Sequence, residues 1–360
     1  MIKFILKRLF YGFLVIFGVI TVVFVLFNIL PGDPARMMLG QRSDISSVEA
    51  INRDLGRDKS LPLQYLNYLN DLSPISYHDF KNKKDYFYLD SSKYNPYTVL
   101  FTFSSQKAIV LKTPYLRRSY QTQRKVSEML LKAFPNTAIL ALTAIIFALI
   151  VGVIVGIIAA VKKDSLFDKL SLFISVLGMS LPSFFAAILI AWLFAYVLSQ
   201  YTGLNMFGSL YTVDDFGEGE YLDLKNLILP AITLGIRPLA VVIELTRSSV
   251  LDVLSQDYVR TAKAKGLKFY KIILNHVLKN AMNPVVTAIS GWLASLMAGA
   301  VFVEYIFDWK GVGIIIVDAL EKYDFPLVMG ALLFISVILI IINILVDLIY
   351  GFLDPRIRYK

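Results

Sequence analysis

Long charge-free runs alternate with short charged segments over most of this chain of 360 residues. A helix needs about 20 largely apolar residues to cross a lipid bilayer. Five runs are long enough, at residues 9–32, 133–161, 170–213, 280–303 and 325–346. A sixth run, 226–246, is apolar except for Arg237 and Glu244. The pattern predicts an all-α integral membrane protein with six transmembrane helices, including one helix in the run 170–213 that ends near Leu198.

The basic residues of the short loops indicate the orientation of these helices, because Lys and Arg are retained on the cytoplasmic side of a membrane. With the N-terminus inside, the cytoplasmic segments hold sixteen Lys and Arg, whereas the short outer loops hold three. We therefore predict that both termini are cytoplasmic. The first helix is predicted to remain uncleaved, since its apolar run is long for a signal peptide and no small-residue cleavage site follows it.

The predicted spans divide the chain into four parts. These are a cytoplasmic N-terminus with the first helix (1–32), an extracytoplasmic loop (33–132), a core of helices 2–6 (133–353) and a cytoplasmic tail (354–360). The core includes a long cytoplasmic loop at 247–279.

The outer loop carries weaker signals of its own. Leu63, Leu66 and Leu69 recur at helical spacing and predict an amphipathic helix over 61–71. Residues 94–103 and 108–111 are β-like stretches separated by turn residues.

The composition and the absence of known motifs exclude several classes of function and indicate no catalytic site. Hydrophobic residues make up 57% and charged residues 18% of the chain, against about 45–50% and 25% in soluble domains, so a soluble enzyme is disfavoured. Without cysteines, and with His78 and His276 far apart, no metal site is expected. No phosphate-binding G-x-x-x-x-G-K-[ST] loop occurs, so we expect no cofactor on this chain. Much of the net charge of +9 belongs to the inner loops, and binding to nucleic acid is not expected.

The cytoplasmic loop 247–279 is basic and amphipathic. Two helical segments fit it, separated at Gly266, which can adopt the left-handed conformation that ends a helix. Their apolar stripes consist of Val250, Val253, Leu254 and Tyr258 on the first segment and Ile272, Ile273, His276 and Val277 on the second. From the residues alone, docking onto a partner and lying on anionic lipid headgroups are equally open.

The same loop carries the most specific motif. Its segment DYVRTAKAKGL at 257–267, with NAMNP at 280–284, resembles the loop motif of permease subunits of binding-protein-dependent ABC importers, in particular the dipeptide/oligopeptide/nickel class. Further segments similar to that family are ILPGDP at 29–34, FPNT at 134–137, SLPSF at 180–184, VEYIFDWKGVG at 303–313 and LDPRIR at 353–358. The resemblance covers nearly the whole chain and implies a type I importer permease bundle in a bacterial inner membrane.

The resemblance also implies function and partners. It implies a transport subunit, not an enzyme, that forms half of a translocation pathway for di- or oligopeptides. The implied partners are a second homologous permease, two ATP-binding subunits that use ATP and Mg²⁺, an extracytoplasmic substrate-binding protein and membrane lipid. A permease for nickel or another small solute is the alternative within the class, and a membrane scaffold that transports nothing is the alternative outside it.

The resemblance further implies that the loop couples to an ATPase through a helix over 255–271, with a turn at Gly266. Its packed face would hold Tyr258, Ala262 and Leu267. The full set of candidate coupling residues is Asp257, Tyr258, Arg260, Thr261, Ala262, Lys265, Gly266, Leu267, His276, Asn280 and Pro284.

Two departures from the family stand out. The broader family has Glu-Ala-Ala where this chain has Arg260, Thr261 and Ala262, so a glutamate contact to the ATPase is not carried over. The outer loop is also longer than the family usually shows, with an apparent insertion over 74–113.

Residues inside and beside the spans give further predictions. Arg237 is a candidate pathway residue, because intramembrane charges tend to face a bundle interior or a water-filled path; a structural hydrogen-bond network is the alternative. Gly152 and Gly156 predict close helix packing within the chain. The sequence predicts an acidic rim on the outer side of the membrane, formed by Glu304, Asp308, Asp318, Glu321 and Asp324. It also predicts that Tyr305 and Trp309 belong to an aromatic belt at the outer membrane interface.

Overall fold

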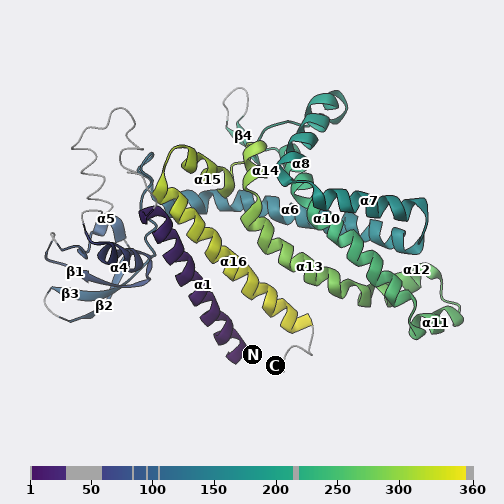
Figure 1. Ribbon diagram of the computed structural model, residues 1–360, viewed down its shortest axis with the longest axis horizontal. Helices are drawn as coiled ribbons and strands as arrows, with labels where there is room; N and C mark the ends of the chain where they lie inside the picture. The colour runs from purple at the N-terminus through teal and green to yellow at the C-terminus, as the bar shows by residue number, and fades with distance from the viewer. Residues whose placement is uncertain are drawn as a thin grey trace. The chain divides into compact units, whose positions relative to one another are not determined.

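The computed structural model describes residues 2–29, 59–82, 85–94, 96–103, 106–213 and 219–353 (Figure 1). Most of the ILPGDP segment at 29–34, and the predicted tail 354–360 with its basic residues, lie outside the described residues. The chain divides into two compact units. They are Met1–Lys132 with Ile315–Val337, and Ala133–Ile314 with Ile338–Lys360.

Helices make up most of both units. The α-helices are α1 (Ile2–Ile29), α4 (Leu61–Leu72), α5 (Ser91–Tyr94), α6 (Val126–Val161), α7 (Leu166–Ser180), α8 (Ser183–Ile190), α9 (Ser199–Thr202), α10 (Lys225–Leu254), α11 (Asp257–Ala264), α12 (Phe269–Ile272), α13 (Leu278–Gly299), α14 (Val301–Ile306), α15 (Val312–Glu321) and α16 (Phe325–Leu353). Two π-helical segments are η2 (Ala191–Val197) and η3 (Ile273–Val277). The strands are β1 (Ile75–Asp79), β2 (Tyr97–Thr102), β3 (Lys107–Lys112), β4 (Tyr211–Val213) and β5 (Glu220–Leu222).

The first unit joins α1, α4 and the beginning of α16 through apolar side chains. Phe24 of α1 lies 5.7 Å from the ring of Tyr68 of α4, measured between ring centroids. Met329 and Leu333 of α16 belong to the same buried cluster. The amphipathic α4 thus covers part of the apolar surface of α1.

A three-stranded antiparallel sheet follows α4, with β3 between β1 and β2. The two β-like stretches of the sequence correspond to β2 and β3, whereas β1 was not predicted. The second unit contains a two-stranded hairpin of β4 and β5. The prediction of an all-α protein therefore holds only in part, because short antiparallel strands pair within the outer loop and within the loop before α10. The chain is mostly helical with two small sheets.

Helix α4 confirms the helix predicted over 61–71, but a different face is buried. The buried residues are Gln64, Tyr68 and Asp71, whereas Leu66 is 55% exposed. The hydroxyl of Tyr94 donates to the Asp71 carboxylate at 2.6 Å, and the Lys112 ammonium donates to the Asp71 backbone oxygen at 2.6 Å. Burial raises the pKa of Asp71 and lowers that of Lys112 to about 8. These internal partners, and not apolar contact alone, decide which face of α4 points inward.

Helices α7 and α8 form one broken segment, bent by 113°. Leu181 at the break has an extended ψ of 129°, because the ring of Pro182 disfavours the helical conformation in the residue before it. The segment then continues through η2 to Val197, in agreement with the predicted end near Leu198. The single span predicted in the run 170–213 is therefore interrupted between Ser180 and Ser183.

Glycines bring α6 and α10 into close contact in the second unit. A Cβ atom added at Gly152 would lie 2.6 Å from the side chain of Val242, and one added at Gly156 would lie 2.6 Å from that of Thr246. The predicted packing within the chain is therefore confirmed. The buried cluster around these helices also includes residues of α8, α13 and α14.

Four helices in the described part of the chain are long and apolar enough to cross a membrane, and a fifth span results if the bent pair counts as one. The four are Leu6–Asn28, Val126–Val161, Lys225–Leu254 and Phe325–Asp347. The remaining predicted span, 280–303, corresponds to α13, a helix of 22 residues that also carries Lys279, Asn280 and Asn283.

Candidate functional site

The predicted elbow at 247–279 consists of short helical segments that follow a long helix. Helix α10 continues to Leu254, past the predicted end of its span at 246. Helix α11 follows, and the chain then turns at Gly266, whose φ is +72°. This left-handed conformation, which side chains disfavour, confirms the predicted break between two helical segments.

One side of the elbow is buried within this chain. Val259 and Ala262 of α11 and Ile272 of α12 pack against Val250 of α10. Ala262 is 6% exposed and contacts this chain's own apolar cluster. The resemblance implies that Ala262 packs against a partner, but this chain's own apolar side chains already cover it.

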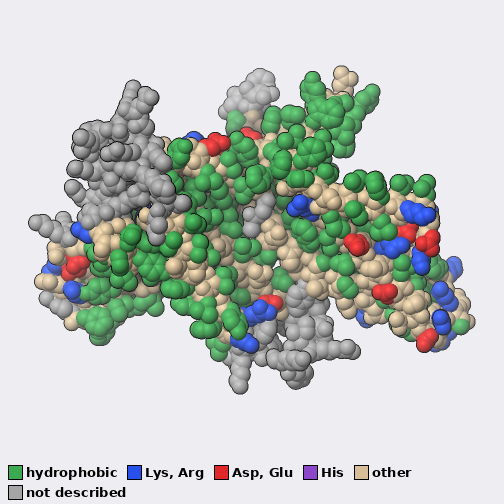
Figure 2. All heavy atoms as spheres, in the orientation of Figure 1, with side chains coloured by type: hydrophobic (Ala, Val, Ile, Leu, Met, Phe, Trp, Pro, Cys, Tyr) green, Lys and Arg blue, Asp and Glu red, His purple; other side chains and the backbone are tan. Residues whose placement is uncertain are grey.

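The opposite side of the elbow is exposed, apolar and basic, and Figure 2 shows Lys and Arg gathered at this end of the second unit. Its large apolar side chains are between 40% and 56% exposed and comprise Tyr258, Leu267, Phe269 and Tyr270. Exposed lysines surround them, at Lys263, Lys265, Lys268 and Lys271. Sequence reasoning missed Phe269 and Tyr270, although two aromatic residues directly after a glycine turn are a recognisable signal.

The structure brings some of the predicted coupling residues together. The Asn280 side-chain amide donates to the Tyr258 hydroxyl at 2.9 Å, and the Thr261 hydroxyl donates to the Asp257 backbone oxygen at 3.0 Å. Arg260 and Asp257 form an exposed ion pair at 3.6 Å. Three others lie apart, with Lys265 exposed after α11, His276 half-buried in η3 and Pro284 exposed on α13.

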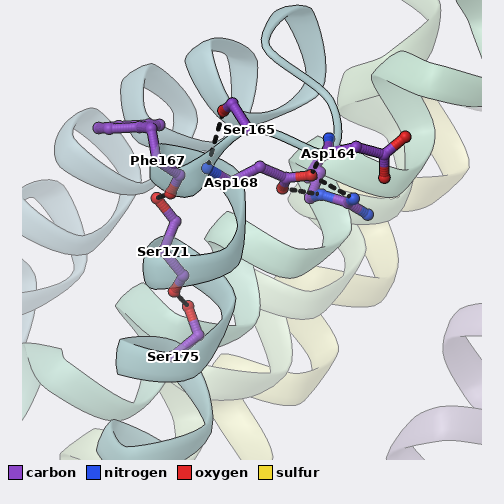
Figure 3. A network of polar contacts seen from close by, with 7 residues as sticks. Asp164, Ser165, Phe167, Asp168, Ser171 and Ser175 are labelled. Carbon is purple, nitrogen blue, oxygen red and sulfur yellow. Dashed lines mark hydrogen bonds and ion pairs between the residues drawn. The ribbon is translucent and has the colours of Figure 1, made fainter.

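A bidentate ion pair joins α7 to α10 at the start of the elbow (Figure 3). The Arg247 guanidinium donates to both carboxylate oxygens of Asp168, with Nη2 2.7 Å from Oδ2. The same carboxylate accepts the backbone N–H of Asp164 at 2.9 Å, and the Ser165 hydroxyl accepts the backbone N–H of Asp168 at 3.3 Å. The Asp168 side chain is 2% exposed and the Arg247 side chain 20%, so the carboxylate is covered by protein and depends on these hydrogen bonds in place of water.

A cavity of about 120 Å³ lies at the break between α7 and α8. Arg237 of α10 lines this cavity together with Ser183, Trp292 and Ser295. Its Nη2 donates to the backbone oxygen of Leu181 at 3.2 Å. A guanidinium has five N–H donors, so Arg237 can hold the broken helix and still offer donors to a ligand.

Glu304, predicted on an acidic outer rim, is fully buried. The Thr137 hydroxyl donates to its Oε1 at 2.7 Å, and the backbone N–H of Gly313 donates to its Oε2 at 2.6 Å. A Cβ atom at Gly311 or Gly313 would collide with this carboxylate. The two glycines of the segment VEYIFDWKGVG therefore leave space for the buried, hydrogen-bonded carboxylate of Glu304. The prediction that Glu304 lies on an exposed acidic rim is wrong.

The predictions that Asp324 lies on the acidic outer rim and Trp309 in the outer aromatic belt are also wrong. Asp324, in the first unit, is 1% exposed and accepts a hydrogen bond of 2.5 Å from the Ser119 hydroxyl. Trp309 is fully buried, and its indole N–H donates to the backbone oxygen of Asn136 at 3.0 Å. Both side chains find polar partners far away in the sequence, which a local pattern does not reveal. Asp308 and Tyr305 are exposed.

The sequence matches two family models. One, described as "Binding-protein-dependent transport system inner membrane component", covers residues 152–359, and its N-terminal counterpart covers residues 1–84. The first match includes more than half of the chain. This protein therefore belongs to the family of inner membrane components of binding-protein-dependent transport systems. As a member, it is a multi-pass inner-membrane permease subunit and not an enzyme, and ATP hydrolysis resides in partner subunits.

Similar proteins match over the full length of the chain. The di/tripeptide transport system permease protein DppB of Pseudomonas aeruginosa is 34% identical over 380 aligned residues, covering 100% of both chains. The dipeptide transport system permease protein DppB of Escherichia coli K12 is 34% identical over 377, also covering 100% of both. The glutathione transport system permease protein GsiC of Escherichia coli is 33% identical over 360, again covering 100% of both. Among solved structures, the MetNI methionine ABC transporter in an inward-facing form aligns with 63% of this chain and 97% of that chain at a TM-score of 0.49 and 14% identity.

Proposed function

We propose that this chain is the permease subunit of an ATP-driven importer of di- and tripeptides. The observation that carries this proposal is 34% identity, over the whole chain, to permeases named for di/tripeptide and dipeptide transport. In this proposal the chain has six transmembrane helices with both termini in the cytoplasm. It forms one half of a type I importer bundle, a second homologous permease forming the other.

The exposed side of the elbow is the proposed contact with the ATP-binding subunit. Its large apolar side chains, including Tyr258 and Phe269, are exposed and not covered by this chain's own core. The lysines around them would complement acidic residues at the rim of a partner's surface. Two ATP-binding subunits that use ATP and Mg²⁺ complete the transporter in this proposal. An extracytoplasmic substrate-binding protein delivers the peptide.

Arg237 is the proposed contact with the peptide inside the translocation pathway. A guanidinium and a carboxylate form paired hydrogen bonds, and every linear peptide carries one terminal carboxylate. Hydroxyl groups of Ser183 and Ser295 line the same cavity and can accept or donate hydrogen bonds. This arrangement favours an anionic end group over a bare metal cation such as nickel.

Uptake by cells tests the substrate. We expect cells that carry the complete transport system to accumulate labelled di- and tripeptides, and cells without this chain to lose that uptake. An Arg237→Glu variant should lower peptide uptake at least about tenfold, since a paired hydrogen bond to charge is worth about 1.5–3 kcal/mol, while Arg237→Lys retains part of it. Nickel uptake without peptide uptake would favour the alternative substrate class. A chain that purifies without a second permease and an ATPase would favour the scaffold.

A matched pair of glycine variants tests coupling. Gly266 and Gly203 both have a positive φ, +72° and +59°, and both face open space, so a tryptophan strains the backbone similarly at each. We expect Gly266→Trp to abolish peptide-stimulated ATPase activity and uptake, because Gly266 lies at the turn of the proposed contact. Gly203→Trp, outside the elbow, should leave both near the unmodified level. Equal effects of the two variants would refute the assigned contact.

A further inference from the structure

A second exposed apolar surface lies on the three-stranded sheet of the first unit. Directly paired residues of antiparallel strands point to the same side of a sheet, and the register places Tyr77, Ile109 and Phe101 in one row. We call the surface made by this row and its neighbours the outer sheet face; its residues are Ile75, Tyr77, Phe101, Phe103, Ile109 and Leu111. Apart from the half-buried Ile109, these side chains are 38–62% exposed. Figure 2 shows the apolar side chains gathered over these strands.

The sheet is held firmly on α4. The Asn70 side chain bonds both the N–H and the C=O of Tyr77, at 2.8 and 3.0 Å. The Lys112 backbone N–H donates to the oxygen of Pro74 at 2.9 Å, and the Lys112 ammonium donates to the backbone oxygen of Asp71. The outer sheet face therefore has a fixed position relative to α4.

Helix α4, in turn, lies beside the apolar part of α1. Its Tyr65 hydroxyl is hydrogen-bonded to the Thr21 hydroxyl at 2.7 Å, and the Tyr65 ring lies 5.0 Å from that of Phe24. The apolar segment of α1 runs on to Asn28, and at 1.5 Å per residue Thr21 lies about 10 Å below its end. Helix α4 therefore contacts the last part of the apolar segment of α1.

An exposed apolar side of α1 lies beside this contact. Val22, Val25 and Leu26 are 41–57% exposed beside the contact with α4, as expected for side chains that face acyl chains. On α4 itself, Leu61 and Leu66 are about half exposed. Apolar side chains thus lead from α1 across α4 toward the sheet.

We propose that the outer sheet face rests on the extracytoplasmic leaflet of the bilayer, with its aromatic side chains among the lipid headgroups and upper acyl chains. The insertion over 74–113 then acts as a membrane-resting element that steadies the loop beside α1. This role is additional to peptide transport, and the proposed topology enters only in deciding which leaflet is contacted.

The chemistry of the outer sheet face favours lipid over a protein partner. Aromatic and aliphatic side chains dominate it, and the Lys107 ammonium lies 5.7 Å from the centroid of the Tyr77 ring. Tyr, Phe and a lysine that reaches toward headgroups are typical of membrane interfaces. All six residues of the edge strand β2 are exposed, and in water such an apolar edge invites aggregation. Contact with lipid covers it.

A single-cysteine label tests the proposal, since the chain contains no cysteine. A nitroxide is attached to Phe101→Cys in the complete transporter, reconstituted in liposomes of phosphatidylethanolamine and phosphatidylglycerol. Thr102→Cys is the matched control, because Thr102 is the adjacent exposed residue and pairs with the buried Ala108, so it points to the opposite face. Collision of each label with oxygen, which concentrates in lipid, is compared with collision with a water-soluble chromium complex.

We expect the ratio of oxygen to chromium accessibility to be several-fold higher at position 101 than at position 102. Equal ratios would overturn the proposal, because the outer sheet face would then lie in water. Exclusion of both reagents from position 101 would also overturn it, since a protein would then cover the face. Neither outcome depends on peptide uptake, so failure of the proposed transport function is distinguishable.

Discussion

Glu304 illustrates how a single buried carboxyl group organises its surroundings. A carboxyl group removed from water is costly unless hydrogen bonds replace its hydration, and here the Thr137 hydroxyl and the Gly313 N–H supply them. The Thr137 hydroxyl also accepts the backbone N–H of Val312 at 2.8 Å. The acid thus links α6 to α14 and to the beginning of α15, and the adjacent Gly311 leaves the space it needs.

Two glycine-to-alanine variants test this arrangement. Gly311→Ala places a methyl group against both the Glu304 carboxylate and the Thr137 hydroxyl, and we expect it to destabilise the protein by about 1–3 kcal/mol through overpacking. Gly291→Ala is the control, since nothing lies near an added Cβ there and alanine favours a helix. Thermal unfolding in detergent should show a lower midpoint for the first variant only. An unchanged midpoint for Gly311→Ala would contradict the proposed packing.

Helix α7 is fastened to α10 at both of its ends. Arg247 holds Asp168 in the first turn of α7, and Arg237 holds the Leu181 carbonyl directly after its last turn. Between these two contacts, the absence of a side chain at Gly178 allows α7 to approach Ile236 of α10 closely: a Cβ atom added at Gly178 would lie 3.0 Å from the Ile236 side chain. Since α10 leads straight into the elbow, we expect a displacement of the elbow to carry α7, and with it the cavity at the bend.

A double-mutant cycle on Asp168 and Arg247 measures this fastening. We expect Asp168→Asn and Arg247→Gln each to lower the free energy of unfolding, and the two together to cost less than their sum by about 1–3 kcal/mol, because the residues share one interaction. The exposed pair Asp257 and Arg260, treated in the same way, should show a coupling of about 0–1 kcal/mol. Chemical unfolding in detergent provides the values. Additive effects at Asp168 and Arg247 would contradict the fastening.

Across the whole molecule, the sequence predicted what depends on neighbouring residues. Apolar runs located the long helices, and the positive φ at Gly266 followed from one glycine between two amphipathic segments. The extent of the bend beside Leu181 could not be predicted, because a proline at position 182 alone does not determine whether a helix kinks or breaks. Glu304 was misplaced because its partner Thr137 lies 167 residues away. The strand order of the sheet and the burial of Ala262 likewise depend on distant segments.

Labelling from either side of the membrane tests the proposed topology. Lys163 and Lys322 are both exposed, one in the turn between α6 and α7 and the other after α15, and the proposed orientation puts them on opposite sides. A membrane-impermeant maleimide should label Lys322→Cys in intact spheroplasts and Lys163→Cys only after lysis. The reverse pattern would refute the proposal that both termini are cytoplasmic.

The contact of α6 with α10 has a consequence for chimeric permeases. Gly152 and Gly156 leave no room for a side chain opposite Val242 and Thr246, so the two helices are complementary only as a matched set. Recombination with a relative should therefore exchange both helices together, with a crossover after α10. Exchanging α10 alone would pair these glycines with foreign side chains at positions 242 and 246, and exchanging α6 alone for a helix without the two glycines would place a Cβ against Val242 and Thr246.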